Sequence, residues 1–452
     1  MVRLNPLFSV PLLAMAPLVA APLGLLSVLF NVGESQPLQP TGLQGQVLVA
    51  EWRTPWVAGL NPDPAIDQIL AQYLAGLAQQ GWSIPDQGIW IQTGDSAIAQ
   101  HQGQIPMPAA SLTKLATTLA TLKHWPLDHQ FETLVGFHGT LENGIVQGDL
   151  VVQGGGDPLF VWEEGIVLAN HLQSLGIQQV TGDLVIVDGF TMNFSEDPNV
   201  SAENLKRVMH ADTWNNEIRA AYGNLEANTA QPSLAINGTV RRIPSNALPA
   251  ETTWLVRHQS LPLVAILKAM NIYSNNVMSE QVAALVGGAR VVTETASVMA
   301  DLPPGELSLI NGSGLGVDNK MSARAAVALT TALQRELEQQ GYSVADVLPV
   351  SGEDVGTLID RRIPATAAVK TGTLAEVSAL AGMVPTADRG LVWFAIINRG
   401  WAIPDLRVQQ DQLLQAIQAQ WGVATVPAHL STKVKMQTPD YRYGDPRRNV
   451  DP

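Results

Sequence analysis

Three short groups of side chains in this sequence could together carry out nucleophilic chemistry. Ser111 and Lys114 stand three residues apart, Ser274 and Asn276 stand two apart, and Lys370 begins a Lys-Thr-Gly triplet. The patterns Ser-x-x-Lys, Ser-x-Asn and Lys-Thr-Gly each occur once, in that order. A hydroxyl beside an amine is a nucleophile with a candidate base. The other two groups add a second hydroxyl, an amide and a second amine to that pair.

The first pair stands at the start of a predicted helix over residues 111–124. The spacing of a helix face recurs in its apolar side chains, which are Leu112, Leu115, Leu119 and Leu122. Side chains three apart on a helix are neighbours, about 5–6 Å apart at Cβ. A serine that begins a helix is also an ordinary cap. The other two motifs therefore decide whether Ser111 is catalytic.

These residues fit acyl transfer from a peptide, which needs an activated hydroxyl, a proton relay and donors for the developing oxyanion. Ser111 is the expected nucleophile. Lys114 can be its base only if burial or a nearby positive charge lowers the pKa of the amine, and Lys370 could supply that charge. Ser274 is suited to pass a proton to the leaving amine, and the Asn276 amide can hold both a substrate peptide group and the first lysine.

The Lys-Thr-Gly segment is expected to bind the substrate. It lies in a predicted strand over residues 367–374, and an extended peptide can pair with such a strand by strand addition. Gly372 leaves room for a close approach. We expect the backbone N–H groups of Ser111 and Thr373 to form the oxyanion hole. The lysine of this motif and Thr371 are expected to meet a substrate carboxylate.

Composition narrows the class of protein. The chain has 452 residues, of which 46% are hydrophobic and 15% charged, which is typical of globular proteins with more than one domain. A net charge of −14 without a long basic run disfavours nucleic acid as a partner. The absence of cysteine excludes disulfides and zinc thiolate sites. There is no His-Glu-x-x-His motif of a zinc peptidase, and no complete Gly-x-Ser-x-Gly motif of an α/β-hydrolase.

The N-terminal residues 1–33 predict export. Arg3 is followed by an uncharged, mostly apolar run from Leu7 to Phe30, which is long enough to span a bilayer. Three prolines interrupt the run and weaken a regular membrane helix. We therefore favour a signal peptide over a retained membrane anchor, and we expect the protein in the periplasm or cell envelope.

The remaining pattern predicts an α+β chain. Helices are expected over 61–80, 164–175, 261–269, 277–286, 323–340 and 405–420, and strands over 88–93, 96–100, 131–139, 148–153, 182–188, 367–374, 378–385 and 391–398. The last three strands should form an antiparallel meander. The N-terminal and C-terminal parts are expected to build one antiparallel sheet covered by helices. An all-helical region would face that sheet, with the motifs at their junction.

The three motifs are those of penicillin-binding proteins and class A β-lactamases. The sequence resembles the D-alanyl-D-alanine carboxypeptidase/endopeptidase family of low-molecular-mass penicillin-binding proteins, in which an insertion separates the first two motifs. The resemblance runs from about Gly88 to Trp401. It includes further family-like stretches, at Gln147–Pro158, Asn311–Leu315, Leu348–Gly352 and Ala379–Gly382.

The resemblance implies a penicillin-binding-protein/β-lactamase-like transpeptidase fold with an inserted β-rich subdomain. It implies a serine D-Ala-D-Ala carboxypeptidase, with endopeptidase action as a second activity. The substrates would be peptidoglycan stem peptides, the inhibitors β-lactams, and neither a metal nor a cofactor would take part. Its catalytic residues would be Ser111, Lys114, Ser274, Asn276 and Lys370, and its substrate-binding residues Thr371, Gly372 and Thr373.

The predicted organisation has five parts. They are a signal peptide or membrane anchor at 1–33, a linker at 34–60, a peptidase domain formed by 61–137 and 251–425, an inserted subdomain at 138–250, and a disordered tail at 426–452. The interval between the first two motifs is shorter than in the larger family members, which predicts a reduced insertion.

The sequence departs from the family at two specificity positions. Several members hold the diamino acid of the stem peptide with an arginine just after Ser-Gly-Leu and with an acid after a Trp-rich stretch. The matching positions here are Val317 and Asn216. The side-chain specificity, including endopeptidase action on cross-links, therefore stays open.

Two alternatives share the motifs. A serine β-lactamase would need a base for its deacylating water, and nothing in the sequence identifies one. The long insertion also argues against it. A non-catalytic peptidoglycan-binding protein would not need the three intact motifs.

Overall fold

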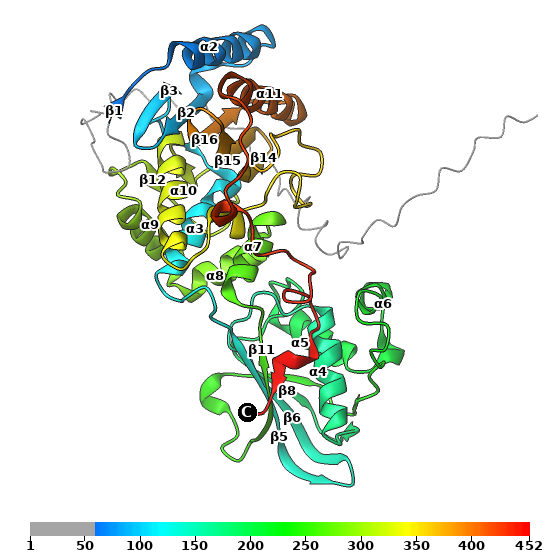
Figure 1. Cartoon of the computed structure of the whole chain (residues 1–452). Helices are drawn as coiled ribbons and strands as arrows, with labels where there is room; N and C mark the ends of the chain where they lie inside the picture. The colour runs from blue at the N-terminus through cyan, green and yellow to red at the C-terminus, as the bar shows by residue number, and fades with distance from the viewer. Residues whose placement is uncertain (1–58) are drawn as a thin grey trace, which may run out of the picture.

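The computed structural model describes residues 59–452, so the predicted signal segment and nearly all of the linker lie outside the described residues. Figure 1 shows two bodies, with the N-terminal strands and the last long helix in the upper body and a second sheet in the lower body. Within the described part of the chain, no single helix is long and apolar enough to cross a membrane, although the bent pair α8 (Asn276–Leu285) and α9 (Gly288–Met299) passes that test together.

A six-stranded sheet forms the centre of the upper body, in the order β1-β3-β2-β16-β15-β14. Its strands are β1 (Gly59–Leu60), β2 (Gln87–Thr93), β3 (Ser96–His101), β14 (Ala368–Leu374), β15 (Val377–Thr386) and β16 (Gly390–Arg399). The last three strands form the predicted antiparallel meander. Antiparallel pairing of β16 with β2 joins the two ends of the chain into one sheet. The strand with the Lys-Thr-Gly motif, β14, is left at the sheet edge.

Both faces of this sheet are buried, as the apolar run of β16 requires. Phe394 and Ile396 pack toward α2 (Pro64–Gln79) and α11 (Ile403–Trp421). The alternate residues of the strand pack with the helical region on the other face, because successive side chains of a strand point to opposite faces. That region contains α3 (Thr113–Leu122), α7 (Leu263–Ile272), α8 (Asn276–Leu285), α9 (Gly288–Met299) and α10 (Ala323–Glu338). A small sheet adjoins it, formed in order by β12 (Leu307–Ser308), β13 (Lys320–Met321) and β4 (Met107–Pro108). The sequence did not predict α9, which begins at Gly288, the second of two consecutive glycines with positive φ.

The lower body is the inserted subdomain, and it has its own sheet and apolar core. The sheet contains β5 (Glu132–Glu142), β6 (Ile145–Gln153), β7 (Gln179–Val180), β8 (Leu184–Val187), β9 (Ala235–Ile236), β10 (Val240–Ile243), β11 (Thr253–Gln259) and β17 (Asn449–Val450). Three helices pack with it, namely α4 (Trp162–Ser174), α5 (Pro198–Val208) and α6 (Asn216–Tyr222). This body begins before residue 138 and ends after residue 250. The sequence predicted neither α5 nor α6, although Asp197 caps α5 and Pro198 begins it, which is a recognised helix-start signal.

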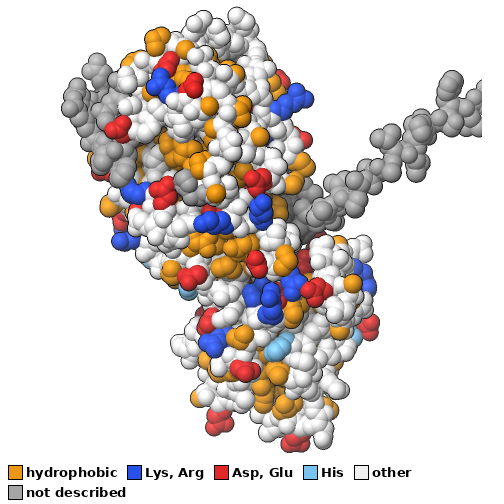
Figure 2. All heavy atoms as spheres, in the orientation of Figure 1, with side chains coloured by type: hydrophobic (Ala, Val, Ile, Leu, Met, Phe, Trp, Pro, Cys, Tyr) orange, Lys and Arg blue, Asp and Glu red, His pale blue; other side chains and the backbone are white. Residues whose placement is uncertain are grey.

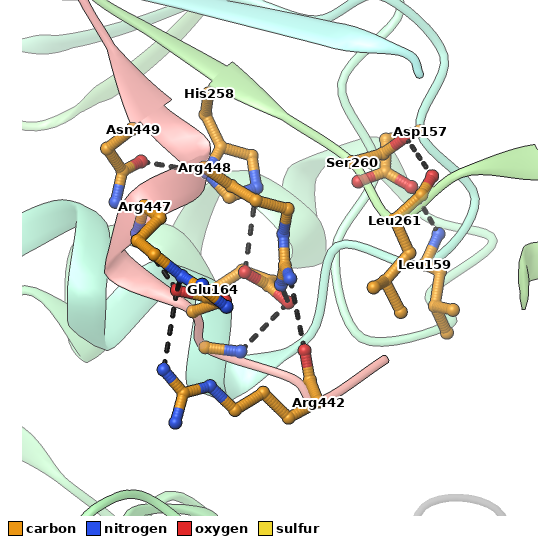
Figure 3. A network of polar contacts seen from close by, with 12 residues as sticks. Asp157, Leu159, Glu164, His258, Ser260, Leu261, Arg442, Arg447, Arg448 and Asn449 are labelled. Atoms are coloured by element: carbon orange, nitrogen blue, oxygen red, sulfur yellow. Dashed lines mark hydrogen bonds and ion pairs between the residues drawn. The ribbon is translucent and has the colours of Figure 1, made fainter. Parts of the chain in front are cut away.

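The tail at 426–452, predicted to be disordered, is folded. Its first part packs on the upper body, where Val434 is buried and its N–H donates to Asp346 Oδ1 at 3.2 Å, and its end packs on the lower body. Its strand β17 pairs antiparallel with β11. Figure 3 shows how the tail reaches the buried Glu164 of α4: Arg448 forms an ion pair with that carboxylate, and Asn449 Oδ1 lies 2.8 Å from His258 Nδ1. The tail is rich in Pro, Arg and Asp, and this composition predicted disorder. The contacts that order the tail depend on partners distant in the sequence, so composition did not reveal them. On the face in Figure 2, basic and acidic side chains lie side by side where the two bodies meet.

The Glu164–Arg448 contact should stabilise the lower body. Arg448→Met keeps much of the side-chain length but leaves the Glu164 carboxylate buried, at 3% side-chain exposure, without its cation. Removing one partner of a buried pair costs about 3–5 kcal/mol. We expect urea unfolding of the lower body to show a loss of about that size.

The matched control is the neighbouring Arg447→Met. The Arg447 side chain is largely exposed where it pairs with Asp445, so its loss should change the unfolding free energy little. Equal effects of the two substitutions would contradict a role of the buried pair in holding the tail.

Candidate active site

The first motif lies where three segments of the upper body meet. Ser111 is in a single 3-10 turn, Ala110–Leu112, and α3 follows directly, so the predicted helix over 111–124 begins with a tighter turn. Ala110 has a φ of +48°, a left-handed conformation that is unfavourable for alanine. This turn places Ser111 just before the N-terminal end of α3, whereas the Lys114 side chain points into the protein.

The Lys114 amine is fully buried and has three oxygen partners. Its Nζ lies 3.1 Å from Ser111 Oγ, 2.8 Å from Asn276 Oδ1 and 2.8 Å from the Ser313 carbonyl oxygen. A neutral amine has two N–H donors and one lone pair. The Asn276 and Ser313 oxygens can take the two donors, which leaves the lone pair for the hydroxyl proton of Ser111.

Burial also changes the protonation of this amine. It lowers the pKa of Lys114 from 10.5 to about 7, and the Glu280 carboxylate opposes part of that shift. The cause is the loss of hydration of the charged form. A substantial fraction of Lys114 is therefore neutral near pH 7, as a general base requires.

The second and third motifs form another pair beside the first. Ser274 lies in the break between α7 and α8 with a φ of +52°, and Asn276 is the first residue of α8. Lys370 Nζ donates to Ser274 Oγ at 2.9 Å and to the Thr371 carbonyl at 2.8 Å. Burial, and then the nearby Lys114 amine, lower the pKa of Lys370 well below 10.5. Burial, rather than the expected charge of the second lysine, is thus the main cause of the low pKa of Lys114.

Two glycines allow the segments to approach Ser111 closely. A Cβ on Gly372 of β14 would lie 3.1 Å from both the Ser111 nitrogen and Ala110 Cβ. Gly314 has a φ of +85°, and a Cβ there would lie 1.9 Å from the Ala110 carbonyl oxygen. Strand β14 and the loop over 311–315 are therefore in contact with the turn that carries Ser111. Thr373, the next residue of β14, is exposed.

Sequence reasoning missed Glu280 as part of this site. Its two carboxylate oxygens accept hydrogen bonds from the Gly312 and Ser313 N–H groups, at 3.0 and 2.9 Å. This holds the loop so that the Ser313 carbonyl meets Lys114. A signal was available, because Glu280 stands four residues after Asn276 and so lies on the same face of α8.

The two positions of the family departures are separated in the structure. Val317 follows the loop that contacts Lys114 and is partly exposed. Asn216 begins α6 of the lower body, and Figure 1 shows that helix well apart from α3 and α8. Of the two, only Val317 adjoins the motif cluster. Among residues 59–452, no group of three His, Asp or Glu side chains is arranged to hold a metal ion.

Comparison with known proteins decides the family. The sequence profile of the D-Ala-D-Ala carboxypeptidase 3 (S13) family matches residues 65–235 and 220–420. The chain belongs to this family. It is therefore a serine-type D-Ala-D-Ala carboxypeptidase, and the predicted resemblance and enzyme class are confirmed.

Curated proteins that are similar to this carboxypeptidase match it over more than two thirds of their own length. Carboxypeptidase DacB of Mycolicibacterium smegmatis is 26% identical over 363 residues, which cover 71% of this chain and 77% of the relative. The D-alanyl-D-alanine carboxypeptidase of Actinomadura sp. strain R39 is 24% identical over 428 residues, covering 71% and 78%.

Solved structures support the fold. A predatory peptidoglycan endopeptidase from Bdellovibrio bacteriovorus matches with a TM-score of 0.65 at 18% identity, over 79% of this chain and 98% of that one. Penicillin binding protein 4 from Haemophilus influenzae matches with a TM-score of 0.58 at 17% identity, over 78% and 99%. The predicted α+β, penicillin-binding-protein-like fold is thereby confirmed.

The close approach at Gly314 can be separated from its backbone conformation. Gly314→Ala places a methyl group against the Ala110 carbonyl, whereas Gly316, with a φ of +98°, has open space around it. Positive φ alone should cost each alanine variant about 1–3 kcal/mol. We expect both variants to unfold at lower temperature, but only Gly314→Ala should also slow labelling by a fluorescent penicillin. Equal labelling rates in two folded variants would show that this contact does not position Ser111.

Proposed function

We propose that this carboxypeptidase removes the terminal D-alanine of peptidoglycan stem peptides through an acyl-enzyme on Ser111. The observation that carries the proposal is the buried Lys114 amine, 3.1 Å from Ser111 Oγ and with a pKa of about 7. We further propose that the N-terminal apolar segment directs export, so that the enzyme acts in the periplasm, where stem peptides are accessible.

In the acylation step, neutral Lys114 takes the hydroxyl proton as Ser111 Oγ attacks the carbonyl carbon of the penultimate D-alanine. The negative charge that develops on the carbonyl oxygen is stabilised by the backbone N–H groups of Ser111 and Thr373. The proton then passes through the Ser274 hydroxyl, which is bonded to Lys370, to the leaving amine nitrogen. The C–N bond breaks, D-alanine leaves, and an ester joins the shortened peptide to Ser111.

In the deacylation step, water attacks the ester carbonyl and Lys114 accepts a proton from it. The tetrahedral intermediate collapses, the shortened peptide leaves with a new carboxylate, and the proton returns to Ser111 Oγ. The same residues therefore serve both halves of the reaction, with water replacing the serine hydroxyl. Lys370 keeps the second hydroxyl in place throughout by its 2.9 Å contact with Ser274.

The substrate is proposed to bind as an added strand along β14. This strand lies at the edge of the six-stranded sheet. Residues 349–351 pair with the start of that edge, where the Val369 N–H donates to the Pro349 carbonyl. From Lys370 onward the edge can offer backbone donors and acceptors to an extended peptide. Gly372 keeps the approach to Ser111 open. Thr371 and Thr373 flank it and would bind the carboxylate that follows the scissile bond.

The side-chain preference of the site is proposed to depend on apolar contacts. Ile310, Leu315 and Val317 are exposed on and beside the loop that contacts Lys114, at 59%, 49% and 37% exposure. These side chains can pack against the aliphatic part of the third stem residue without an ion pair. Discrimination between charged and amidated forms of that residue should accordingly be weak.

A direct test compares wild type with Ser111→Ala on a stem pentapeptide and on a cross-linked dimer. Wild type should release D-alanine from the pentapeptide, and the variant should lose this activity by about 10³-fold or more, because the attacking oxygen is gone. Splitting of the dimer would add endopeptidase action. D-alanine would be measured by an oxidase-coupled assay.

Ser174→Ala provides the matched control, since Ser174 lies on α4 of the lower body and bonds only the His171 carbonyl among the described residues. D-alanine release that survives in Ser111→Ala would contradict the mechanism. Rapid penicillin hydrolysis without peptide cleavage would instead identify a β-lactamase.

A further inference from the structure

An arginine of the last long helix reaches the substrate-side strand. Arg407 of α11 donates from Nη2 to Thr373 Oγ1 at 2.8 Å. Thr371 and Thr373 are two residues apart on β14, so their side chains share one face. Val369 lies on the same face, and it packs in the apolar cluster that includes Leu406 of α11. The hydrogen bond therefore joins the strand to a helix that borders the same apolar cluster.

Thr373 keeps a donor for a ligand in this arrangement. Its hydroxyl oxygen accepts the hydrogen bond from Arg407, so the hydroxyl hydrogen can be donated elsewhere. The Thr373 side chain is exposed, beside the strand edge to which a peptide would add. The arginine and the threonine thus offer neighbouring donors on the solvent side of β14.

The Arg407 guanidinium has more N–H donors than it has partners among the described residues, in contrast to the guanidinium of its neighbour Arg361. Arg361 forms an ion pair with Asp411 Oδ1 at 2.7 Å, and the other oxygen of that carboxylate accepts from the Arg362 N–H at 2.7 Å. Within residues 59–452, no carboxylate lies in ion-pair distance of Arg407, whose one hydrogen-bond partner there is Thr373. A guanidinium has five N–H donors in a planar fork that matches a carboxylate. The fork is only partly exposed, so water satisfies it incompletely.

We propose that Arg407 is a specificity-determining residue that binds, together with Thr373 and Thr371, the α-carboxylate of the residue following the scissile bond. The inference rests on the proposed function, because that carboxylate belongs to the D-alanine that leaves. With the Thr373 N–H in the proposed oxyanion hole, the scissile carbonyl lies beside this residue, so the α-carboxylate one residue farther along the peptide is brought near Thr373 and Arg407. Charge-assisted hydrogen bonds of this kind hold the substrate in one position and favour a peptide that ends in a free carboxylate at this residue.

The test uses Arg407→Ala and Arg407→Lys on a stem pentapeptide and on the same peptide with a C-terminal amide. The loss of a charged hydrogen bond should lower kcat/KM of Arg407→Ala for the free acid by about 10- to 100-fold, mainly through KM. Its kcat/KM for the amide should change by less than about threefold. Arg407→Lys should recover part of the activity on the acid, because it restores the charge but not the fork.

Arg389→Ala is the matched control. Arg389 lies between β15 and β16 and pairs with Asp63 at 3.0 Å, so its loss should leave the preference for the acid unchanged. Equal losses on acid and amide in Arg407→Ala would show that the arginine only supports β14, and would overturn the proposal. No loss on either substrate would overturn it as well.

A second readout separates this proposal from the proposed function. Acylation of Ser111 by penicillin, which carries a carboxylate, should slow in Arg407→Ala, while acylation by a penicillin ester should not. If wild type formed no adduct on Ser111 and released no D-alanine, the proposed function itself would fail. If wild type did both and the variant treated acid and ester alike, only the role of Arg407 would fail.

Discussion

The burial of one amine determines how the site of this carboxypeptidase is built. A charged lysine without water is unfavourable unless it is well paired. Among the described residues, the Lys114 amine hydrogen-bonds to a hydroxyl, an amide oxygen and a backbone carbonyl, and to no carboxylate. Its pKa therefore falls to about 7. The protein supplies those oxygens from three places in the chain, at Ser111, Asn276 and Ser313. The cost of burying Lys114 is thus the physical reason why this amine suits the proposed role of a base.

The rest of the upper body serves this arrangement. Pairing of β16 with β2 closes one sheet from the two ends of the chain and leaves β14 at its edge, against the turn that holds Ser111. The chain enters the inserted subdomain after α3 and returns to the upper body before α7. The helices that carry the motifs therefore stay together. The tail returns to the lower body and buries Arg448 against Glu164. The two bodies are therefore joined by the tail as well as by the two crossings of the insertion.

The motifs could be predicted from the sequence because each depends on local spacing. Ser111 and Lys114 are three residues apart, and Lys370 lies in a strand whose alternation was readable. What escaped prediction depends on partners distant in the chain. The Ser313 contact uses a backbone oxygen, which leaves no trace in side-chain type. Asn216 is the opposite case. It matched a specificity position of the family in the sequence, but the structure places it on α6, away from the motif cluster.

The same distinction between local spacing and distant partners applies to the secondary structure. The meander β14-β15-β16 and the helices with clear apolar stripes were predicted. Helix α9 was not predicted, because Gly287 and Gly288 stand at its start. The tail was misjudged because composition reports the average behaviour of a segment. The tail is ordered by particular contacts: a strand pairing with β11, the buried Glu164–Arg448 ion pair and a hydrogen bond from Val434 to Asp346.

The central claim is that Lys114 acts as a base whose pKa burial has lowered. It is tested most directly by the rate of Ser111 acylation by benzylpenicillin between pH 5 and 9. The base must be neutral, so the rate should rise through a pKa near 7 and reach a plateau above it. Glu280→Gln removes a charge that raises this pKa and should move the rise to lower pH, while Glu294→Gln on the exposed face of α9 should not. A rate independent of pH across this range, or a rise unmoved by Glu280→Gln, would contradict the account.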